Sequence, residues 1–345
     1  MKANRPFPTP STDPADLYRV RDALYSVDLL IGGLVHLDIF TLLAERPLDL
    51  AGVCKALGSF PRPTDVMLTL FTAMGCLQKQ GEAFAVTSLA REHLVKGSPW
   101  YLGPYYASFK DRKICLDFVD VLKTGKPAGF GGKKDEKDWK HAMENPAFAE
   151  PFTAAMDCRG SYLAPAMAKV FDFKKSSRLL DVAGGSGIYA CAVAAQHQHM
   201  RASVFEKPPV DRVAAAMIEK RGFSDRVSAI AGDMFASPLP SGHDVHLFSN
   251  VIHDWDELDV RKLLQKSRDA LLPGGAVVIH DAHLNREKTG PLPVAEYSAL
   301  LMHSCEGRCY SVAEMEEYLK AAGFANVQFT PTVASRSIVS ARKSS

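Results

Sequence analysis

A glycine-rich turn between an apolar segment and a small-residue segment constrains the fold of this chain more than any other feature. Residues 178–190 read RLLDVAGGSGIYA. The apolar run ends in Asp181, and a helix is predicted over residues 188–196. The glycines between them, which permit a tight turn, are Gly184, Gly185 and Gly187. A strand, a glycine turn and a helix in this order predict a site where the backbone comes very close to a bound ligand.

Two later segments also read as strands that finish on a carboxylate. Residues 201–206, RASVFE, close in Glu206, and residues 227–233, VSAIAGD, close in Asp233. Ligands of open α/β sheets bind beyond the carboxyl ends of the strands. We therefore expect Asp181, Glu206 and Asp233 to surround one pocket. Each feature occurs by itself in many α/β proteins, so it is their ordered combination that indicates a ligand site.

The chemistry of this pocket favours a positively charged nucleoside. Glu206 follows the glycines by about 20 residues, which is the position of a ribose-binding acid. A pyrophosphate fits less well, because Asp181 stands beside the turn and the turn reads D-x-x-G-G-x-G, not G-x-G-x-x-G. The sulfonium and ammonium groups of S-adenosylmethionine (SAM) suit an acidic pocket better.

Several motifs, taken in order, resemble those of the plant-type and acetylserotonin-type O-methyltransferases, a SAM-dependent family, between residues 16 and 343. They are DVAGGSG at 181–187, VFEKPPV at 204–210, RVSAIAGDMF at 226–235, VIHDWDE at 251–257, LLPGGAVVIHD at 271–281 and YLKAAGF at 318–324. The resemblance implies an α/β fold, a Rossmann-like seven-stranded methyltransferase domain whose last strand is antiparallel. It also implies a preceding, mostly helical, winged-helix-like dimerisation domain.

The resemblance further implies which residues contact SAM and the product S-adenosylhomocysteine. The expected cofactor contacts are Asp181, Gly184, Gly185, Gly187, Glu206, Lys207, Gly232, Asp233, Met234, Phe235 and Ser249.

Composition and charge agree with a two-domain globular protein. The 345 residues are 47% apolar and 23% charged, with a net charge of +2, so the chain can bury a large core. The near-neutral charge predicts neither a nucleic acid nor an anionic membrane as partner. No apolar run reaches the length of a membrane span, and residues 2–16 do not resemble a signal peptide. Seven scattered cysteines without a C-x-x-C pair predict reduced thiols in the cytoplasm, and no metal site is expected.

Four segments are predicted along the chain. They are a disordered tail over 1–15, the winged-helix-like dimerisation domain over 16–95, a helical connector over 96–165 that contributes to the acceptor pocket, and the SAM-binding catalytic domain over 166–345. A basic stretch at 123–140 is expected to be a solvated loop, with a role in substrate entry as the alternative.

The order of predicted elements in the dimerisation domain, three helices and a wing, is also that of a winged-helix DNA-binding domain. Its third helix, residues 65–78, contains no Lys or Arg before Lys79, whereas a helix in a major groove needs phosphate and base partners. Such a helix is better explained by packing. Residues 17–43 form a predicted helix, interrupted at Gly32 and Gly33, that is apolar on more than one face, which indicates contact with a second copy of the chain. The resemblance implies the same homodimer.

A histidine follows the fourth predicted strand of the sheet and is the expected general base. His253 and Asp254 come after residues 243–250, so they lie on the same edge as the acids. An imidazole can take the proton of a hydroxyl as that oxygen attacks the methyl group. Asp281, at the end of the fifth strand, is placed to orient the imidazole. The alternative to a catalytic role is a structural one, in which residues 253–255 begin a helix.

Two positions depart from the resembling family. Cys309 stands where the family often has a second glutamate, and Ser249 or Asn250 stands where it usually has Lys or Arg. Cys309 is expected to be an inert pocket thiol, with a role as nucleophile as the alternative. His280 and His246 are expected to be packing residues, since alternation puts His280 on the face opposite Asp281.

The acceptor is expected to be a small hydroxylated aromatic or polyketide-like molecule, because the residues predicted to line its pocket are mostly apolar or aromatic. These residues are Phe152, Met156, Asp254, Tyr297, Met302 and His303. The resulting hypothesis is a SAM-dependent O-methyltransferase with His253 as base. The alternative keeps the fold and bound SAM but methylates carbon or nitrogen, or catalyses a non-methylating reaction such as hydroxylation or cyclisation.

Overall fold

The computed structural model describes residues 7–129 and 143–344, which group into two compact units. We call residues 1–16, 138–283 and 312–345 the sheet unit, and residues 17–137 and 284–311 the helical unit. The chain therefore crosses between the units more than once. The segment 284–311, which the sequence placed inside the domain 166–345, is grouped with the helical unit, because its helix packs against helices near the N-terminus.

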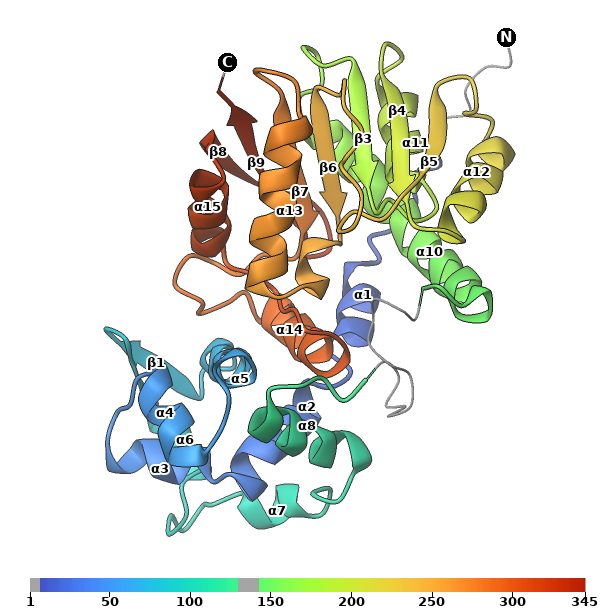
Figure 1. The fold of residues 1–345 in the computed structure, drawn as a ribbon. Helices are drawn as coiled ribbons and strands as arrows, with labels where there is room; N and C mark the ends of the chain where they lie inside the picture. The colour runs from blue at the N-terminus through green and yellow to red at the C-terminus, as the bar shows by residue number, and fades with distance from the viewer. Residues whose placement is uncertain (1–6, 130–142, 345) are drawn as a thin grey trace. The chain divides into compact units, whose positions relative to one another are not determined.

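A seven-stranded sheet forms the sheet unit, as the resemblance implied (Figure 1). Its strands are β3 (Arg178–Val182), β4 (Arg201–Glu206), β5 (Val227–Ala231), β6 (Val245–Ser249), β7 (Ala276–Asp281), β8 (Phe324–Pro331) and β9 (Ser337–Lys343). The spatial order is β5-β4-β3-β6-β7-β9-β8, and β9 runs antiparallel to both of its neighbours. All residues of β7 are buried, as expected for an inner strand of a sheet covered on both faces.

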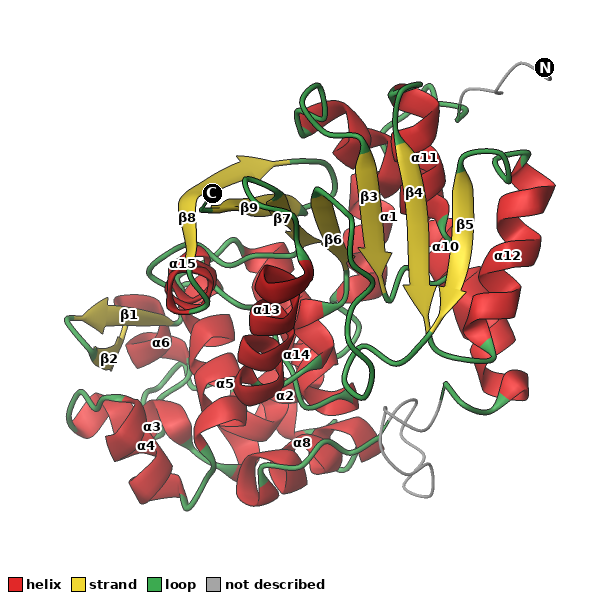
Figure 2. Ribbon diagram, turned by 45° about the horizontal axis from the view of Figure 1, so that its top comes forward, coloured by secondary structure: helices red, strands yellow, loops and turns green. Residues whose placement is uncertain are grey.

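Helices cover both faces of this sheet (Figure 2). They are α10 (Pro146–Val170), α11 (Ile188–Gln196), α12 (Val210–Arg221), α13 (Glu257–Ala270) and α15 (Val312–Ala321), with a short 3-10 turn, η3 (Ile252–Asp254). The 25-residue helix α10 begins where Asn145 accepts a hydrogen bond from the Ala147 amide at 3.0 Å. Residues 7–14 form no helix or strand, and Asp13 accepts a hydrogen bond from the Tyr162 hydroxyl at 2.8 Å.

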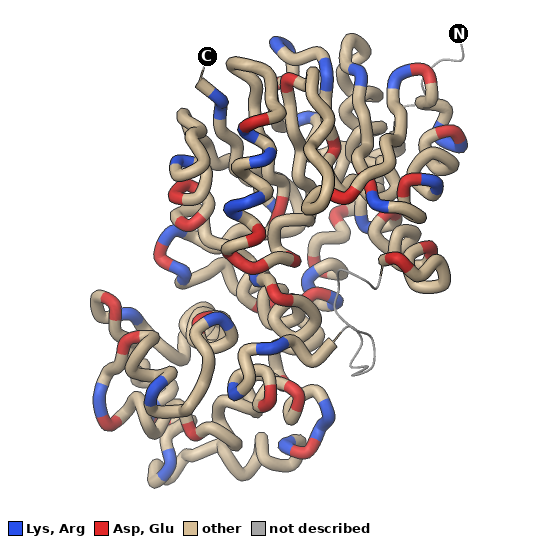
Figure 3. The backbone as a smooth tube through the Cα atoms, viewed as in Figure 1, with Lys and Arg blue, Asp and Glu red and all other residues tan. Residues whose placement is uncertain are grey.

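The helical unit contains most of the N-terminal helices and one later helix. Its elements are α1 (Ala15–Asp22), α2 (Ser26–Ile31), the π-helical turn η1 (Gly32–His36), α3 (Ile39–Glu45), α4 (Leu50–Leu57), α5 (Pro61–Ala73), β1 (Leu77–Gln80), β2 (Ala83–Val86), α6 (Ser88–His93), α7 (Gly103–Ala107), α8 (Lys113–Thr124) and α14 (Leu292–Ser304). Strands β1 and β2 pair as an antiparallel hairpin, and the winged-helix character of the unit stays a prediction. In Figure 3 basic and acidic residues are intermixed along this unit.

The first predicted helix is divided more often than the sequence indicated. Gly32 and Gly33 form the π-helical turn, and a Cβ at Gly33 would lie 2.7 Å from the ring of Phe71, so only glycine fits there. The following break occurs at Asp38, whose φ of +52° cannot continue a right-handed helix. Within the described residues no single helix is long and apolar enough to cross a membrane, although the bent pair Ser26–His36 and Ile39–Glu45 passes that test jointly.

Candidate active site

The predicted acids lie at the carboxyl ends of three adjacent parallel strands, β3, β4 and β5. The Asp181 carboxylate is fully buried and accepts a hydrogen bond from the Ala190 amide at 3.3 Å. A Cβ on Gly184 would lie 2.5 Å from that carboxyl carbon, so only glycine can pass beside Asp181. Glu206 accepts a hydrogen bond from the Gly185 amide at 2.9 Å, which ties the glycine turn to the neighbouring strand.

Burial gives two of these acids unusual proton affinities. It raises the pKa of Asp181 to about 7, with the nearby charge of Glu206 adding to the effect. It also raises the pKa of Glu206 to about 6, although hydrogen bonds from the Gly185 and Lys207 amides oppose it. For Asp233, burial is outweighed by hydrogen bonds from the Phe235 and Ala236 amides, so its pKa is lowered. Two desolvated carboxyl groups at neighbouring strand ends would favour a bound cation.

The loop after β5 is held from outside the pocket. The Lys266 ammonium donates hydrogen bonds to the carbonyl oxygens of Met234 at 2.6 Å, Phe235 at 2.8 Å and Ser237 at 2.6 Å. The ring of Phe235 also packs edge-on against Trp255, 4.6 Å between centroids. Lys266 was missed by the sequence reasoning, and on an exposed-looking helix nothing in the sequence identified it. It gives the predicted contacts Met234 and Phe235 a defined loop conformation.

The remaining predicted cofactor contacts lie at the same strand ends. The Lys207 ammonium is 2.5 Å from Glu144 and 3.4 Å from Asp233. A Cβ on Gly232 would collide with the ring of Phe205. Ser249 ends β6, and its Oγ is buried without a hydrogen-bond partner among the described residues, as is Asp181 Oδ1. Two buried polar atoms of this kind call for a polar ligand or water.

His253 and Asp281 form a buried hydrogen-bonded pair. His253 lies in η3 and is 4% exposed, and Asp281 ends β7 and is 2% exposed. Nδ1 of the imidazole donates to Asp281 Oδ1, which also accepts from the Ala282 amide at 2.7 Å. Burial by itself would raise the pKa of Asp281, but the charge and hydrogen bond of His253 hold it well below its usual range.

The hydrogen bond with Asp281 makes Nε2 the basic nitrogen of the His253 ring. A proton on Nδ1, held by Asp281, leaves the lone pair on Nε2. Nε2 is 3.6 Å from Asp254 Oδ1, so a proton taken up there would be stabilised by a second carboxylate. The imidazole therefore lies between two carboxylates, those of Asp281 and Asp254.

The other histidines near β6 and β7 have protein partners. His280 Nε2 is 3.1 Å from Thr332 Oγ1, and His246 Nδ1 is 3.0 Å from Ser267 Oγ. Burial lowers the pKa of each to about 3, so both are neutral. His283 Nδ1 is 2.8 Å from Ser337 Oγ, and burial lowers its pKa to about 4. These are the surroundings of core histidines.

The predicted acceptor contacts fall in both units. Phe152 and Met156 are half-buried on α10, and Phe152 stacks on Phe148 with centroids 5.7 Å apart. Tyr297, Met302 and His303 are buried on α14 of the helical unit.

His303 has the contacts of a core residue. Its ring packs against Tyr25 and Phe118, with centroids 4.9 and 5.3 Å away, and Nε2 is 3.4 Å from Asp117 Oδ2. Its contact with the acceptor stays a prediction.

Most of the basic stretch 123–140 lies outside the described residues, which exclude 130–142.

The two departures from the family are both buried. Cys309 is 1% exposed, and its amide donates to Ser298 Oγ at 3.1 Å. Asn250 adopts a φ of +54° and donates from Nδ2 to the Tyr189 hydroxyl at 3.0 Å. Burial raises the pKa of Tyr189 to about 12, so the hydroxyl stays protonated.

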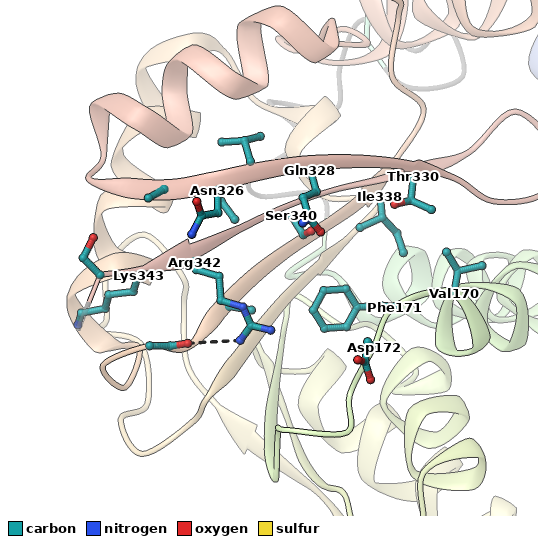
Figure 4. Close-up of a pocket in the computed structure, with 16 residues that line it drawn as sticks. Val170, Phe171, Asp172, Asn326, Gln328, Thr330, Ile338, Ser340, Arg342 and Lys343 are labelled. Carbon is teal, nitrogen blue, oxygen red and sulfur yellow. Dashed lines mark hydrogen bonds between the residues drawn. The ribbon is translucent and has the colours of Figure 1, made fainter.

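A separate hollow of about 860 Å³ lies beside the β8–β9 pair (Figure 4). Its lining includes Phe171, Ser340 and Arg342, and Arg342 Nη1 donates to the Gly274 carbonyl at 3.3 Å. The hollow reaches Ala276, which begins β7, whereas Asp281 ends that strand. None of the predicted site residues lines it, so it is distinct from the strand ends that carry the predicted acids.

Comparisons with known proteins identify relatives of the chain. Residues 120–325 match a family model described as an O-methyltransferase domain. The 3-hydroxy-5-methyl-1-naphthoate 3-O-methyltransferase of Streptomyces sahachiroi is 31% identical over 296 residues, 85% of each chain. The acetylserotonin O-methyltransferase of Bos taurus is 30% identical over 337 residues, covering 92% of this chain and 95% of its own. Two further relatives, 29% and 28% identical, are named as a C-methyltransferase and an N,N-dimethyltransferase.

A solved structure resembles the whole chain. The O-methyltransferase family 2 protein from Planctomyces limnophilus, in complex with apigenin, is 33% identical, covers 99% of both chains and superimposes with a TM-score of 0.87.

Proposed function

The chain belongs to the SAM-dependent O-methyltransferase family, and from this premise we propose that it methylates a hydroxyl group of a small aromatic or polyketide-like metabolite, with His253 as the general base. The observation that carries the proposal is the buried His253–Asp281 pair at the edge of the sheet where the acidic pocket lies.

SAM is the methyl donor, and the residues of the pocket fit it. Asp181 Oδ1 and Ser249 Oγ, which are buried and have no hydrogen-bond partner in the described part of the chain, offer polar contacts, and the closeness of Gly184 to Asp181 leaves no room for a side chain. Glu206 is the residue to accept hydrogen bonds from ribose hydroxyls. Desolvated Asp181 and Glu206 would gain most from a positively charged ligand. When bound, SAM supplies an electrophilic methyl group on a positively charged sulfur.

His253 would take the proton of the acceptor hydroxyl at Nε2. Asp281 keeps the other ring proton on Nδ1, and so holds the tautomer that is a base at Nε2. As the imidazole becomes positively charged, Asp281 and Asp254 stabilise it. Burial of the pair keeps water away from the developing alkoxide or phenoxide, which strengthens these interactions.

Names of the relatives support a ring-bearing acceptor. One relative acts on a hydroxynaphthoate, and the solved structure was obtained with apigenin. The stacked pair Phe148–Phe152 on α10, with Met156 one turn later, offers the apolar surface that such a ring requires.

The alternative reaction keeps SAM but transfers its methyl group to carbon or nitrogen, or uses it without methyl transfer. It is favoured by Cys309, which leaves the segment without the acid that the family often has there. Relatives that are named as C- and N-methyltransferases also support this alternative.

A homodimer is part of the proposal. Leu17 and Val20 on α1, Leu24 in the turn after it and Val27 on α2 are 74, 72, 61 and 50% exposed, and we call these four residues the apolar stripe. A stripe of this size on a globular protein calls for a partner, and a second copy of the chain would cover it.

The test is a transfer assay with SAM labelled in its methyl group and a panel of phenols, hydroxyquinones and hydroxylated pyrroles. We expect label in an oxygen-methylated product, and a loss of about 10²-fold or more in His253→Ala. His93→Ala, at a 34% exposed side chain on α6, is the matched control and should transfer normally. Label only in carbon- or nitrogen-methylated products would favour the alternative reaction. A fully active His253→Ala variant would rule out His253 as the general base.

A further inference from the structure

A three-residue network behind the glycine turn involves no residue of the acidic pocket. Asp157 lies on α10, Ser186 within the turn and Arg221 at the end of α12. Asp157 Oδ1 accepts a hydrogen bond from Ser186 Oγ at 2.5 Å and another from Arg221 Nη2. Arg221 Nη1 donates to the Ser186 carbonyl oxygen at 3.3 Å. Three elements distant in sequence therefore meet at one serine.

Both oxygens of Ser186 are occupied by this network. Ser186 is 3% exposed, and the side chains of Arg221 and Asp157 are 19 and 17% exposed. Hydrogen bonds that involve a charged group are stronger than those between neutral groups, and partial burial reduces their screening by solvent. The network therefore has the strength to define the conformation of the turn.

The turn needs such support. Gly185 and Gly187, on either side of Ser186, have φ values of +55° and +71°. Without contacts that fix it, a glycine backbone can adopt many other conformations. The Gly185 amide donates a hydrogen bond to Glu206. In the proposed function, however, Glu206 must also accept hydrogen bonds from the ribose of SAM. Ser186 provides a further attachment, one that ligand binding leaves intact.

We propose that Asp157 and Arg221 are positioning residues that hold the glycine turn, through Ser186, in its SAM-binding conformation. Asp157 adjoins Met156 on α10, so the same carboxylate links the cofactor turn to the helix predicted to contact the acceptor. The inference rests on the proposed function for the identity of the ligand. A turn that is organised before SAM arrives loses less conformational entropy on binding.

An ion pair at this place could instead contribute only to the stability of the fold. The two roles differ in what they change. A stability role lowers the melting temperature and leaves the affinity of the folded protein for SAM intact. A positioning role weakens SAM binding by the folded protein, and it leaves kcat at saturating SAM close to normal because His253 and Asp281 are untouched.

The experiment measures SAM and S-adenosylhomocysteine dissociation constants of the full chain by titration calorimetry, with kinetics at saturating acceptor. The variants are Asp157→Asn, Ser186→Ala and Arg221→Gln, with Arg221→Lys as the conservative change and Lys220→Gln, at the exposed neighbour of Arg221, as control. Amide exchange of residues 181–190 in the absence of SAM reports on the turn directly.

We expect each of the first three variants to weaken SAM binding about tenfold and to speed amide exchange in the turn. The double variant Asp157→Asn/Arg221→Gln should lose little more than either single variant, because both act through Ser186. Arg221→Lys should recover part of the affinity, and Lys220→Gln should bind normally.

Variants that melt earlier yet bind SAM as tightly as the wild type would overturn the inference and leave the proposed function intact. A wild-type chain that fails to bind SAM would instead reject the proposed function, and this inference with it.

Discussion

His253 donates a hydrogen bond from Nδ1 to the carboxylate of Asp281, 28 residues later in the chain, and both side chains are almost fully buried. The relationship joins a short turn after β6 to the end of β7, two strands that are hydrogen-bonded neighbours in the sheet. It decides which nitrogen carries the proton, and it leaves Nε2 as the basic atom. The proposed chemistry therefore depends on both residues of the pair.

Replacing Asp281 by asparagine should reduce kcat by about 10²-fold or more, with SAM affinity unchanged. The amide keeps the shape of the carboxylate, but it no longer stabilises a positive imidazole and it permits the wrong tautomer. Steady-state kinetics and calorimetry with SAM separate the two quantities. Asp281→Glu, which keeps the charge, should be less impaired, and equal damage in both variants would argue against an electrostatic role.

Affinity for SAM should fall as the pH is lowered from about 8 to about 5.5. Ligand-free Glu206 and Asp181 have pKa values raised to about 6 and about 7 by burial, so they are increasingly protonated in that range. A protonated carboxyl attracts a cation less and accepts fewer hydrogen bonds. Calorimetry across this range is the measurement, and Glu206→Gln should show a weaker pH dependence together with weaker binding at the alkaline end.

The same two acids should make the ligand-free protein less stable as the pH rises. Because their pKa values are raised in the folded state, the fold binds more protons than the unfolded chain between about pH 4 and 7, and unfolding becomes easier as those protons leave. SAM should therefore raise the melting temperature more at about pH 8 than at about pH 5.5. Equal shifts at both pH values would contradict the role of these carboxyl groups.

Gly184→Ala should abolish detectable SAM binding, because the new Cβ would lie 2.5 Å from the Asp181 carboxyl carbon and must displace it. Gly222→Ala is the matched control. Gly222 has a φ of +77°, and a Cβ added there would meet no heavy atom within 4 Å. This change should cost about 1 kcal/mol of stability and leave SAM binding normal. Normal SAM binding by Gly184→Ala would contradict the placement of the pocket.

Cys309→Ala should retain kcat within about twofold of the wild type, since a buried thiol is a poor nucleophile. Thiol reagents should likewise fail to inactivate the native enzyme through this residue. Mass spectrometry of the labelled protein, followed by the activity assay, tests both points. Loss of activity in Cys309→Ala with an unchanged melting temperature would indicate a chemical role for the thiol.

Val20→Glu and Leu24→Arg should convert a dimer into monomers, because each places a charge in the exposed apolar stripe of the helical unit. Sedimentation velocity measures the change. Leu258→Arg, at a residue that is 68% exposed on α13 of the sheet unit, should leave the oligomeric state as it is. A wild-type chain that sediments as a monomer would reject the dimer itself.

Local patterns determined much of the sheet unit. The helix predicted over 188–196 and the strand over 201–206 have those bounds in the structure, because glycine, apolar runs and terminal acids act over a few residues. The positions of Asp181, Glu206, His253 and Asp281 at one sheet edge followed from strand direction alone. The seven-stranded fold followed from the resemblance and is confirmed.

Tertiary structure decided what depends on contacts between distant segments. The break at Asp38 and the π-helical turn beside Phe71 are set by packing that no local pattern encodes. The grouping of 284–311 with the N-terminal helices, the three carbonyl contacts of Lys266 and the Asp157–Ser186–Arg221 network are of the same kind. A sequence determines which residues can form such contacts, but the partners are chosen only when the folded chain brings them within hydrogen-bond distance.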